Sequence, residues 1–313
     1  MTQHRRVPGA RKAVRANLAL ARTQTAAGLP QEANSAAEAA LKDAMALEDQ
    51  WLLGKALLAA ATTLLELARP LEALPLAEEA EQLFAAARRA AAKALRLQAT
   101  RLAARCLAEA GRGPQALARY EFAIAEFAEL PAPRTWRWTT EHAEARAATV
   151  PLLREAGRVA EAVEEAISSI NFWSRHRHPR AARWRCSLYY ELARGLETIG
   201  ELEEAAEAAE MGIAETSRLG THPDRVALLQ TLRGSILVVL GEVTRGGELL
   251  AQAAAGAAPS ESLARLVENY AARPQAPEAL AEWARKLREV PRPVAGGQSV
   301  ADQDTLPETS GES

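Results

Sequence analysis

The stretch Gly111–Ile124, with the sequence GRGPQALARYEFAI, decides the fold because its pattern recurs along the chain. A turn residue is followed by a small residue five positions later, by an aromatic or small residue nine later and by a small residue twelve later. Successive turns of this kind are 40, 43, 46, 43 and 41 residues apart. A period of this size predicts an array of stacked helical units. The turn residues are Gly28, Ala68, Gly111, Gly157, Gly200 and Gly241.

The residues on both sides of each turn repeat as well. Around Gly111, Ala104 lies seven residues before the turn, Leu107 four before and Ala116 five after. Apolar residues at spacings of three and four lie on one face of a helix. We expect the two small residues to lie where the helices of a hairpin cross, with the Leu filling the gap between them. One such hairpin cannot bury its apolar face alone, so neighbouring hairpins must stack.

The 313 residues are enough for one long array, predicted to span residues 1–290. A shorter helix pair at 259–290 is expected to cap the last apolar face. The segment 291–313 is rich in Pro, Gly, Ser and acidic residues, which predicts a disordered acidic tail. The main predicted helix pairs are 9–27 with 30–46, 49–68 with 70–88, 93–110 with 113–129, 136–156 with 158–174, 180–199 with 201–218, and 223–240 with 243–256.

This spacing resembles the tetratricopeptide repeat family over roughly residues 9–256. Units of about 40 residues are longer than the family's usual unit of about 34 residues, and the Trp and Tyr often found in the first helix are mostly missing. The longer units look like the helical arrays of bacterial signalling proteins, including peptide-sensing regulators. The resemblance implies an all-α, right-handed superhelical solenoid, with the first helices lining a concave groove. The best matches are Leu192, Ala193, Leu196, Gly200 and Ala205, and Gly111, Ala116, Tyr120 and Ala123.

The composition of the chain indicates its cellular compartment and excludes some classes of partner. The formal net charge of −2 excludes a polycation drawn as a whole to nucleic acid. Cys106 and Cys186 make no metal or disulfide pattern, which favours a reduced, intracellular setting. No apolar run reaches the roughly 20 residues that a membrane span needs, and the polar, basic N-terminus argues against a secretory signal. We therefore expect a cytoplasmic protein without a membrane partner.

The first helices supply a basic set of groove residues. Arg22, Arg105 and Arg194 share one slot, six residues before the turn. The planar guanidinium suits carboxylate or phosphate groups, so the set predicts a groove for an acidic peptide or protein. The alternative is a solvated helix face with Arg supplied by composition. The predicted contacts are Arg15, Arg22, Lys55, Arg101, Arg105, Arg154, Tyr190 and Arg194.

A second candidate is an edge where basic and aromatic residues alternate. Such an edge is typical of a protein contact, because Trp and Arg are favoured there, and it is compatible with phosphates and stacked bases of a nucleic acid. The alternative is that the Trp side chains fill the joint between repeats. The edge residues are Trp136, Arg137, Trp173, Arg177, Arg180 and Trp184.

Motifs for catalysis are missing from the sequence. There is no phosphate-binding Gly-rich loop, nucleophile elbow or HExxH motif. His176, His178 and Cys186 do not complete a tetrahedral set, so neither a metal nor a cofactor is expected. The sequence predicts a non-catalytic scaffold or adaptor that binds a protein or peptide. The alternatives are a regulator that senses a small peptide or nucleotide, and a nucleic-acid-associated protein that uses the edge.

Overall fold

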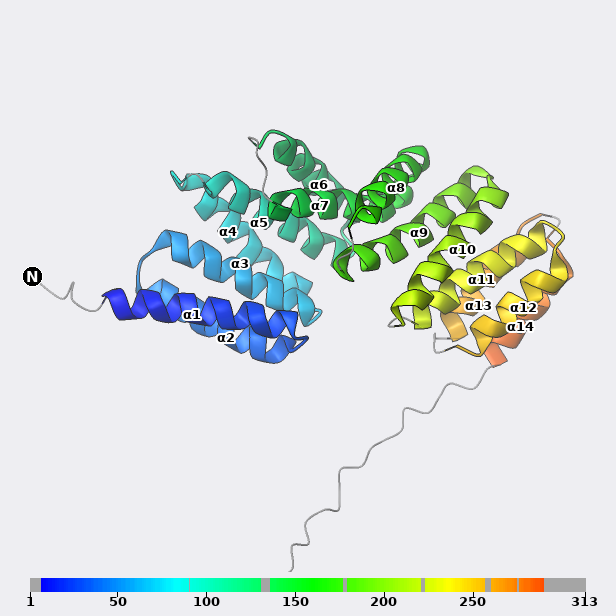
Figure 1. The fold of residues 1–313 in the computed structure, drawn as a ribbon, viewed down its shortest axis with the longest axis horizontal. Helices are drawn as coiled ribbons and strands as arrows, with labels where there is room; N and C mark the ends of the chain where they lie inside the picture. Colours follow the sequence, from blue (N-terminus) through cyan, green and yellow to red (C-terminus); the bar gives the residue numbers. More distant parts are fainter. Residues whose placement is uncertain are drawn as a thin grey trace, which may run out of the picture. The chain divides into compact units, whose positions relative to one another are not determined.

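A computed structural model describes residues 7–89, 91–130, 136–176, 179–220, 223–256, 260–274 and 276–289. Over these residues the chain forms fourteen α-helices and no strand (Figure 1). Consecutive helices pair as hairpins, which confirms the predicted all-α array. The helices are α1 (Val7–Ala26), α2 (Pro30–Ala46), α3 (Gln50–Glu66), α4 (Pro70–Ala86), α5 (Ala92–Glu109), α6 (Gly113–Ala128), α7 (Trp136–Glu155), α8 (Val159–Ser174), α9 (Pro179–Ile199), α10 (Leu202–Leu219), α11 (Pro223–Val239), α12 (Val243–Ala254), α13 (Ser260–Ala271) and α14 (Glu278–Glu289).

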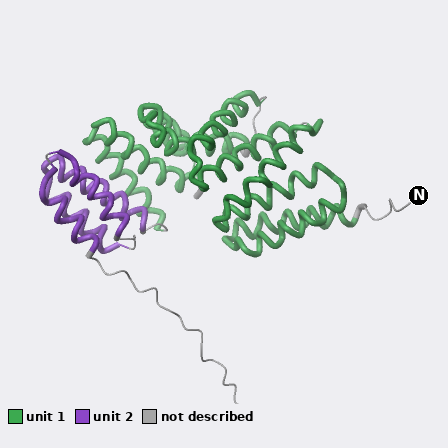
Figure 2. The backbone as a smooth tube through the Cα atoms, turned by 180° about the vertical axis from the view of Figure 1, so that it is seen from behind, with its two compact units in different colours: residues 1–221 green, residues 222–313 purple. Residues whose placement is uncertain are grey.

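The chain divides into two compact units, residues 1–221 and 222–313 (Figure 2). The first unit holds the five hairpins from α1 to α10, and the second holds α11 to α14. The helices α13 and α14 pack against each other, and their role as a cap of the array stays a prediction. The continuity of the array over residues 1–290 stays a prediction, and the predicted acidic tail lies outside the described residues.

In the first unit, the first helices of successive hairpins lie side by side. Helix α1 packs against α3, α3 against α5, α5 against α7 and α7 against α9, in addition to the partner of each within its hairpin. One face of this unit is therefore built from first helices only, and side chains from different hairpins meet on it. We call it the first-helix face.

The predicted turns share one backbone motif. At Gly111, the N–H of Arg112 donates to the carbonyl of Leu107 (2.8 Å) and the N–H of Gly111 donates to Ala108 (3.0 Å). This is the Schellman arrangement, which requires a left-handed residue, and Gly111 has a φ of 74°. Arg112 is also the N-cap residue of α6, so one turn ends the first helix and begins the second. The same bonds and a positive φ recur at Gly28, Ala68, Gly157, Gly200 and Gly241.

The residues seven before and five after each predicted turn are all buried and, apart from Val150, small, as expected for residues at helix crossings. Ala104 and Ala116 are both fully buried. In the second unit the two helices of the first hairpin approach closely, because a Cβ on Gly246 would lie 2.6 Å from the carbonyl oxygen of Gly234. A larger side chain at these positions would push the two backbones apart.

Ala68 is the one predicted turn residue that is not Gly, and its φ of 56° is unfavourable for a residue with a Cβ. Replacing Ala68 by Gly should raise the free energy of unfolding by about 1 kcal/mol. Gly111→Ala should lower it by a similar amount, since an added Cβ there meets no atom within 4 Å and only the backbone is strained. Urea unfolding followed by circular dichroism measures both changes.

The matched control is Ala110→Gly, one residue before the turn at a φ of −83°. At this position Gly increases the conformational entropy of the unfolded chain and relieves no strain in the folded one. The free energy of unfolding should therefore fall by up to about 1 kcal/mol. If Ala68→Gly lowered stability as Ala110→Gly does, the left-handed residue would not be a source of strain.

Candidate binding site

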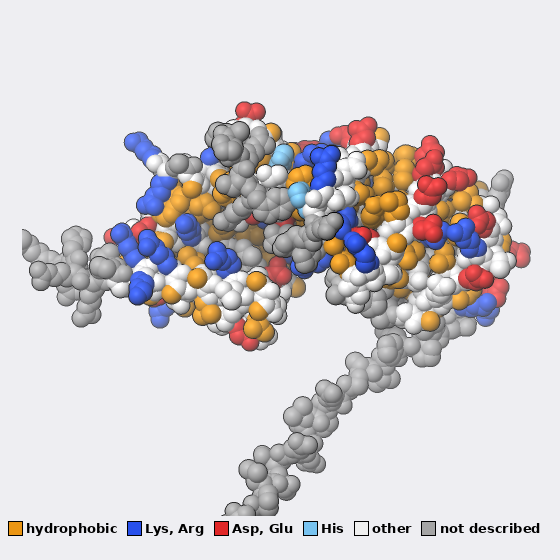
Figure 3. Space-filling view, in the orientation of Figure 1, with side chains coloured by type: hydrophobic (Ala, Val, Ile, Leu, Met, Phe, Trp, Pro, Cys, Tyr) orange, Lys and Arg blue, Asp and Glu red, His pale blue; other side chains and the backbone are white. Residues whose placement is uncertain are grey.

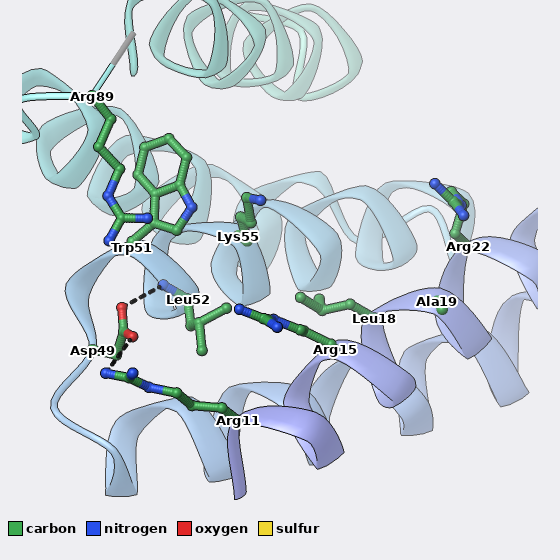
Figure 4. Close-up of a pocket in the computed structure, with 10 residues that line it drawn as sticks. All are labelled: Arg11, Arg15, Leu18, Ala19, Arg22, Asp49, Trp51, Leu52, Lys55 and Arg89. Atoms are coloured by element: carbon green, nitrogen blue, oxygen red, sulfur yellow. Dashed lines mark hydrogen bonds and ion pairs between the residues drawn. The ribbon is translucent and has the colours of Figure 1, made fainter. Parts of the chain in front are cut away.

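A positively charged pocket of about 470 Å³ lies between α1 and α3. Five cationic side chains and one carboxylate line it (Figure 4). Lys and Arg side chains also gather over the N-terminal helices in the space-filling view (Figure 3). We call this site the basic pocket. Its lining residues are Arg11, Arg15, Leu18, Ala19, Arg22, Asp49, Trp51, Leu52, Lys55 and Arg89.

Helix α1 contributes three of the cations. Arg11 and Arg15 are four residues apart, which places them on the same helix face. Arg11 forms an ion pair with Asp49 (3.3 Å), while the Asp49 carboxylate caps α3 by accepting a hydrogen bond from the N–H of Leu52 (3.2 Å). Arg15 and Arg22 are exposed and make no ion pair with the described residues. The only carboxylate of the pocket is thus engaged, and two guanidinium groups remain for a ligand.

Trp51 holds the other two cations at the pocket. The guanidinium carbon of Arg89 lies 4.7 Å from the centroid of the Trp51 ring, and the Lys55 Nζ lies 5.2 Å from it. Cation–π contacts of this kind hold both cations against the indole ring. Trp51 itself packs edge-on against Phe84, with ring centroids 5.5 Å apart. Gly54 leaves room for that ring, because a Cβ there would lie 3.0 Å from Phe84.

Sequence reasoning predicted Arg15, Arg22 and Lys55 at this site but missed Arg11, Trp51 and Arg89. The signal for Arg11 was its spacing of four residues from Arg15 on the same helix. Trp51 and Arg89 had no such signal, because their roles depend on packing between α3 and the segment after α4.

Arg101 lies in a buried charge cluster between α5 and α7. Its Nε is 2.7 Å from Glu141 and its Nη1 is 3.6 Å from Glu144, and its side chain is 15% exposed. Burial opposes the guanidinium charge, but the attraction of Glu141 and Glu144 outweighs it and raises the pKa of Arg101. The structure therefore gives Arg101 a role in joining two hairpins, and its contact with a partner stays a prediction.

Arg105 and Arg154 also have carboxylate partners. Arg105 lies 3.3 Å from Glu66 of α3 and 2.8 Å from Glu109 of its own helix. Arg154 of α7 lies 3.0 Å from Glu191 of α9. The sequence contained a signal for part of this pairing, because Glu66 and Glu109 both lie two residues before a predicted turn, in a groove position.

The remaining predicted groove residues lie on α9. Arg194 is half-buried and its Nε lies 3.3 Å from Glu197 of the same helix. Tyr190 is half-buried as well. Of the predicted groove residues, only Arg15, Arg22 and Lys55 line the basic pocket; the other Arg residues face carboxylates from their own or neighbouring helices.

The predicted edge is partly inside the array. Trp173 is 1% exposed, and its ring stacks on that of Trp184 with centroids 6.4 Å apart and an angle of 13°. Arg185 donates a hydrogen bond to the backbone oxygen of Trp173 (2.8 Å). Trp173 thus packs in the joint between α8 and α9, while Trp184 is half-buried. The side chains of Trp136, Arg137 and Arg180, and the whole of Arg177, lie outside the described residues.

Two buried side chains, Cys106 and Tyr120, are held in their neutral forms. Burial raises the pKa of the Cys106 thiol to about 12 and that of the Tyr120 hydroxyl to about 12, so neither is ionised at neutral pH. Over the described ranges, no group of three His, Cys, Asp or Glu side chains lies close enough to hold a metal ion. The helices in the described part of the chain include none long and apolar enough to cross a membrane.

No protein-family model matches the sequence, and no curated protein matches it. Solved structures match its fold. The apo form of RapI is similar over 88% of this chain and 97% of that protein (TM-score 0.62, 11% identity). A Rap conjugation gene regulator of plasmid pLS20, in complex with the Phr* peptide, is similar over 92% of this chain and 79% of that protein (TM-score 0.57, 14% identity). TPR-like repeats of a Podosopora anserina kinesin light chain are similar over 70% of this chain and 99% of that protein (TM-score 0.52, 20% identity).

These similarities, at low sequence identity, establish the fold. The chain is an array of helical hairpins of the tetratricopeptide-like kind, and the resemblance seen in the sequence is confirmed at the level of structure. Fold alone does not determine what such an array binds.

The buried cluster around Arg101 predicts a structural effect. Arg101→Met should lower the free energy of unfolding by about 3 kcal/mol, because it leaves Glu141 and Glu144 buried without their cation. Adding Glu141→Gln should recover part of the loss, since the two sites are coupled. Urea unfolding of the single and double variants measures both effects.

Arg105→Met is the matched control, because its ion pairs are more exposed and should contribute less than about 1 kcal/mol. Equal losses for Arg101→Met and Arg105→Met would contradict a special role for the buried cluster.

Proposed function

We propose that this chain is a non-catalytic scaffold or adaptor of the cytoplasm that binds an acidic peptide or protein segment. The basic pocket is its main contact, and the observation that carries the proposal is the excess of cations there. Five cationic side chains face one carboxylate, which is already engaged by Arg11 and by the N-terminus of α3. Free guanidinium groups of this kind bind carboxylates with paired N–H donors.

The spacing along α1 fits an extended acidic segment. Arg15 and Arg22 are seven residues apart, which corresponds to about 10.5 Å along a helix axis. Three residues of extended chain span about 10 Å. Acidic side chains three residues apart in an extended ligand would therefore reach both guanidinium groups.

The chemistry of the pocket favours binding over catalysis. Its lining offers cations, an indole and aliphatic groups. A catalytic site needs a nucleophile or a general base with a free electron pair aimed at substrate. Asp49 is the one candidate base, and its oxygens accept from Leu52 and pair with Arg11. The site is thus built to hold an anion in place.

Proteins of similar fold support a peptide ligand. The pLS20 Rap regulator was solved in complex with a peptide, which shows that an array of this architecture is compatible with peptide binding. The support is architectural, since the residues that select the ligand differ between proteins that are 14% identical.

A small-ligand sensor is the second candidate. The pocket volume of about 470 Å³ falls within the range of roughly 300–1,000 Å³ that small-molecule sites occupy. A nucleotide or another compact anion would use the same cations. The nucleic-acid alternative through the Arg/Trp edge stays a prediction, because most of its side chains lie outside the described residues.

The test is binding of a fluorescein-labelled peptide with Glu residues three positions apart in a Gly–Ser background. Replacing Arg15 and Arg22 together by Ala should weaken binding about tenfold or more, because two charge-assisted contacts are lost. Raising the salt concentration should weaken binding to the unmodified protein. Fluorescence anisotropy measures the affinities.

The matched control removes two exposed cations elsewhere, Lys42 on α2 and Arg112 at the start of α6, for the same change in net charge. This control should bind the peptide as the unmodified protein does. Equal weakening by both double variants would mean that the peptide responds to overall charge, and the basic pocket would not be its site. Displacement of the peptide by ATP, combined with binding of ATP that depends on Arg15 and Arg22, would favour the small-ligand alternative.

A further inference from the structure

A second pocket is lined mainly by the first helices α5, α7 and α9, and Tyr120 of α6 also lines it. It has a volume of about 220 Å³, and its walls are mainly apolar or aromatic. We call it the apolar pocket. The residues that form its walls include Tyr120, Ala148, Pro151, Leu152, Trp184 and Leu188.

The charged groups at the rim of the apolar pocket are already paired. Arg105 faces Glu109 at 2.8 Å, and Glu191 faces Arg154 at 3.0 Å. The apolar pocket therefore offers little net charge to a ligand, in contrast to the basic pocket. The two pockets therefore suit different chemical groups. The basic pocket attracts anions, whereas the apolar pocket favours groups that bury apolar surface.

The size of the apolar pocket suits a single side chain. Its 220 Å³ is below the roughly 300–1,000 Å³ of sites for drug-sized ligands. One wall is Trp184, which is half-buried and stacked almost parallel on the buried ring of Trp173. Rigid aromatic walls of this kind are typical of the pockets in which a partner's anchor residue is buried.

The spacing between the pockets follows from helix packing. The basic pocket lies between α1 and α3, and the apolar pocket is centred on α7, two and a half helix positions further along the face. Packed helices are about 8–10 Å apart, so the two pockets are about 20–25 Å apart. An extended chain advances about 3.3 Å per residue and covers that distance in about six to eight residues.

We propose that the ligand is a bipartite peptide segment, with acidic residues in the basic pocket and one Phe or Leu side chain in the apolar pocket. The two parts are separated by about six to eight residues of extended chain. This inference rests on the proposed function for its acidic half and adds the apolar anchor, its pocket and the spacing. Because the anchor binds as part of a segment already held at the other pocket, its contribution depends strongly on linker length.

The experiment uses synthetic peptides with an acidic block of about four Glu residues, a Gly–Ser spacer and a terminal Phe, made in both chain directions. The spacers are about two, seven and twelve residues long, to bracket the predicted span. A peptide with the acidic block alone is the reference. Affinities for the 313-residue chain are measured by fluorescence anisotropy.

With the intermediate spacer, Phe should increase the affinity about tenfold over the acidic block alone, in one of the two chain directions. Two variants should abolish this gain: Trp184→Ala, which removes a wall of the apolar pocket, and Ala148→Leu, which fills it from α7. Trp283→Ala, at a half-buried Trp of the second unit, is the matched control and should keep the gain. Circular dichroism confirms that each variant is folded.

Each outcome decides a different point. No gain from Phe at any spacer length, or the same gain in Trp184→Ala and Ala148→Leu, would overturn the apolar anchor while leaving the acidic contact in place. Lack of binding of the acidic block to the unmodified protein would overturn the proposed function and this inference together. Equal gains at all three spacer lengths would show that Phe binds outside the apolar pocket.

Discussion

Each of the six predicted turns of this chain lies at a residue in the left-handed backbone region, and the remaining structure depends on that reversal of the chain. The N–H of the turn residue and the N–H after it satisfy carbonyl groups at the end of the first helix, and the next helix starts at once. Since the turn has a constant length, the crossing of the two helices falls at a constant distance on either side. Small side chains predominate there, and Val150 is the largest residue in this position; the contact between Gly234 and Gly246 shows how close the two helices can come. In the first unit, the first helices of successive hairpins then lie side by side and form a single face.

The Arg side chains of that face have two different environments. In the middle of the first unit they meet carboxylates from the adjacent hairpin, as Arg101 meets Glu141 and Arg154 meets Glu191. On α1, the neighbouring first helix brings a single carboxylate, Asp49, to the basic pocket. The positive potential is therefore concentrated at one end of the face, although basic residues occur along its whole length.

The basic pocket is assembled from segments that have no local relation. Phe84 of α4 fills the space left by Gly54 and supports Trp51, which in turn positions Arg89 and Lys55. A substitution at Gly54 or Phe84 would thus shift Arg89 and Lys55 of the basic pocket indirectly, through Trp51. The apolar pocket is composite in the same way, since the ring of Trp184 is held by a residue of the preceding hairpin, Trp173.

The sequence by itself determined the turns, the crossing residues and therefore the fold. Left-handed backbone and close helix contact each demand a particular kind of residue, and both recur at constant spacing, so they are visible in one chain. It also predicted that Arg15, Arg22 and Lys55 lie on the first helices, facing the same side, and all three line the basic pocket. Only the tertiary structure decided which cations remain available, because the partner of Arg101 lies 40 residues away. It likewise decided that Trp173 is buried. Whether a surface side chain is accessible depends on what the next hairpin places opposite it, and helix periodicity carries no information about that contact.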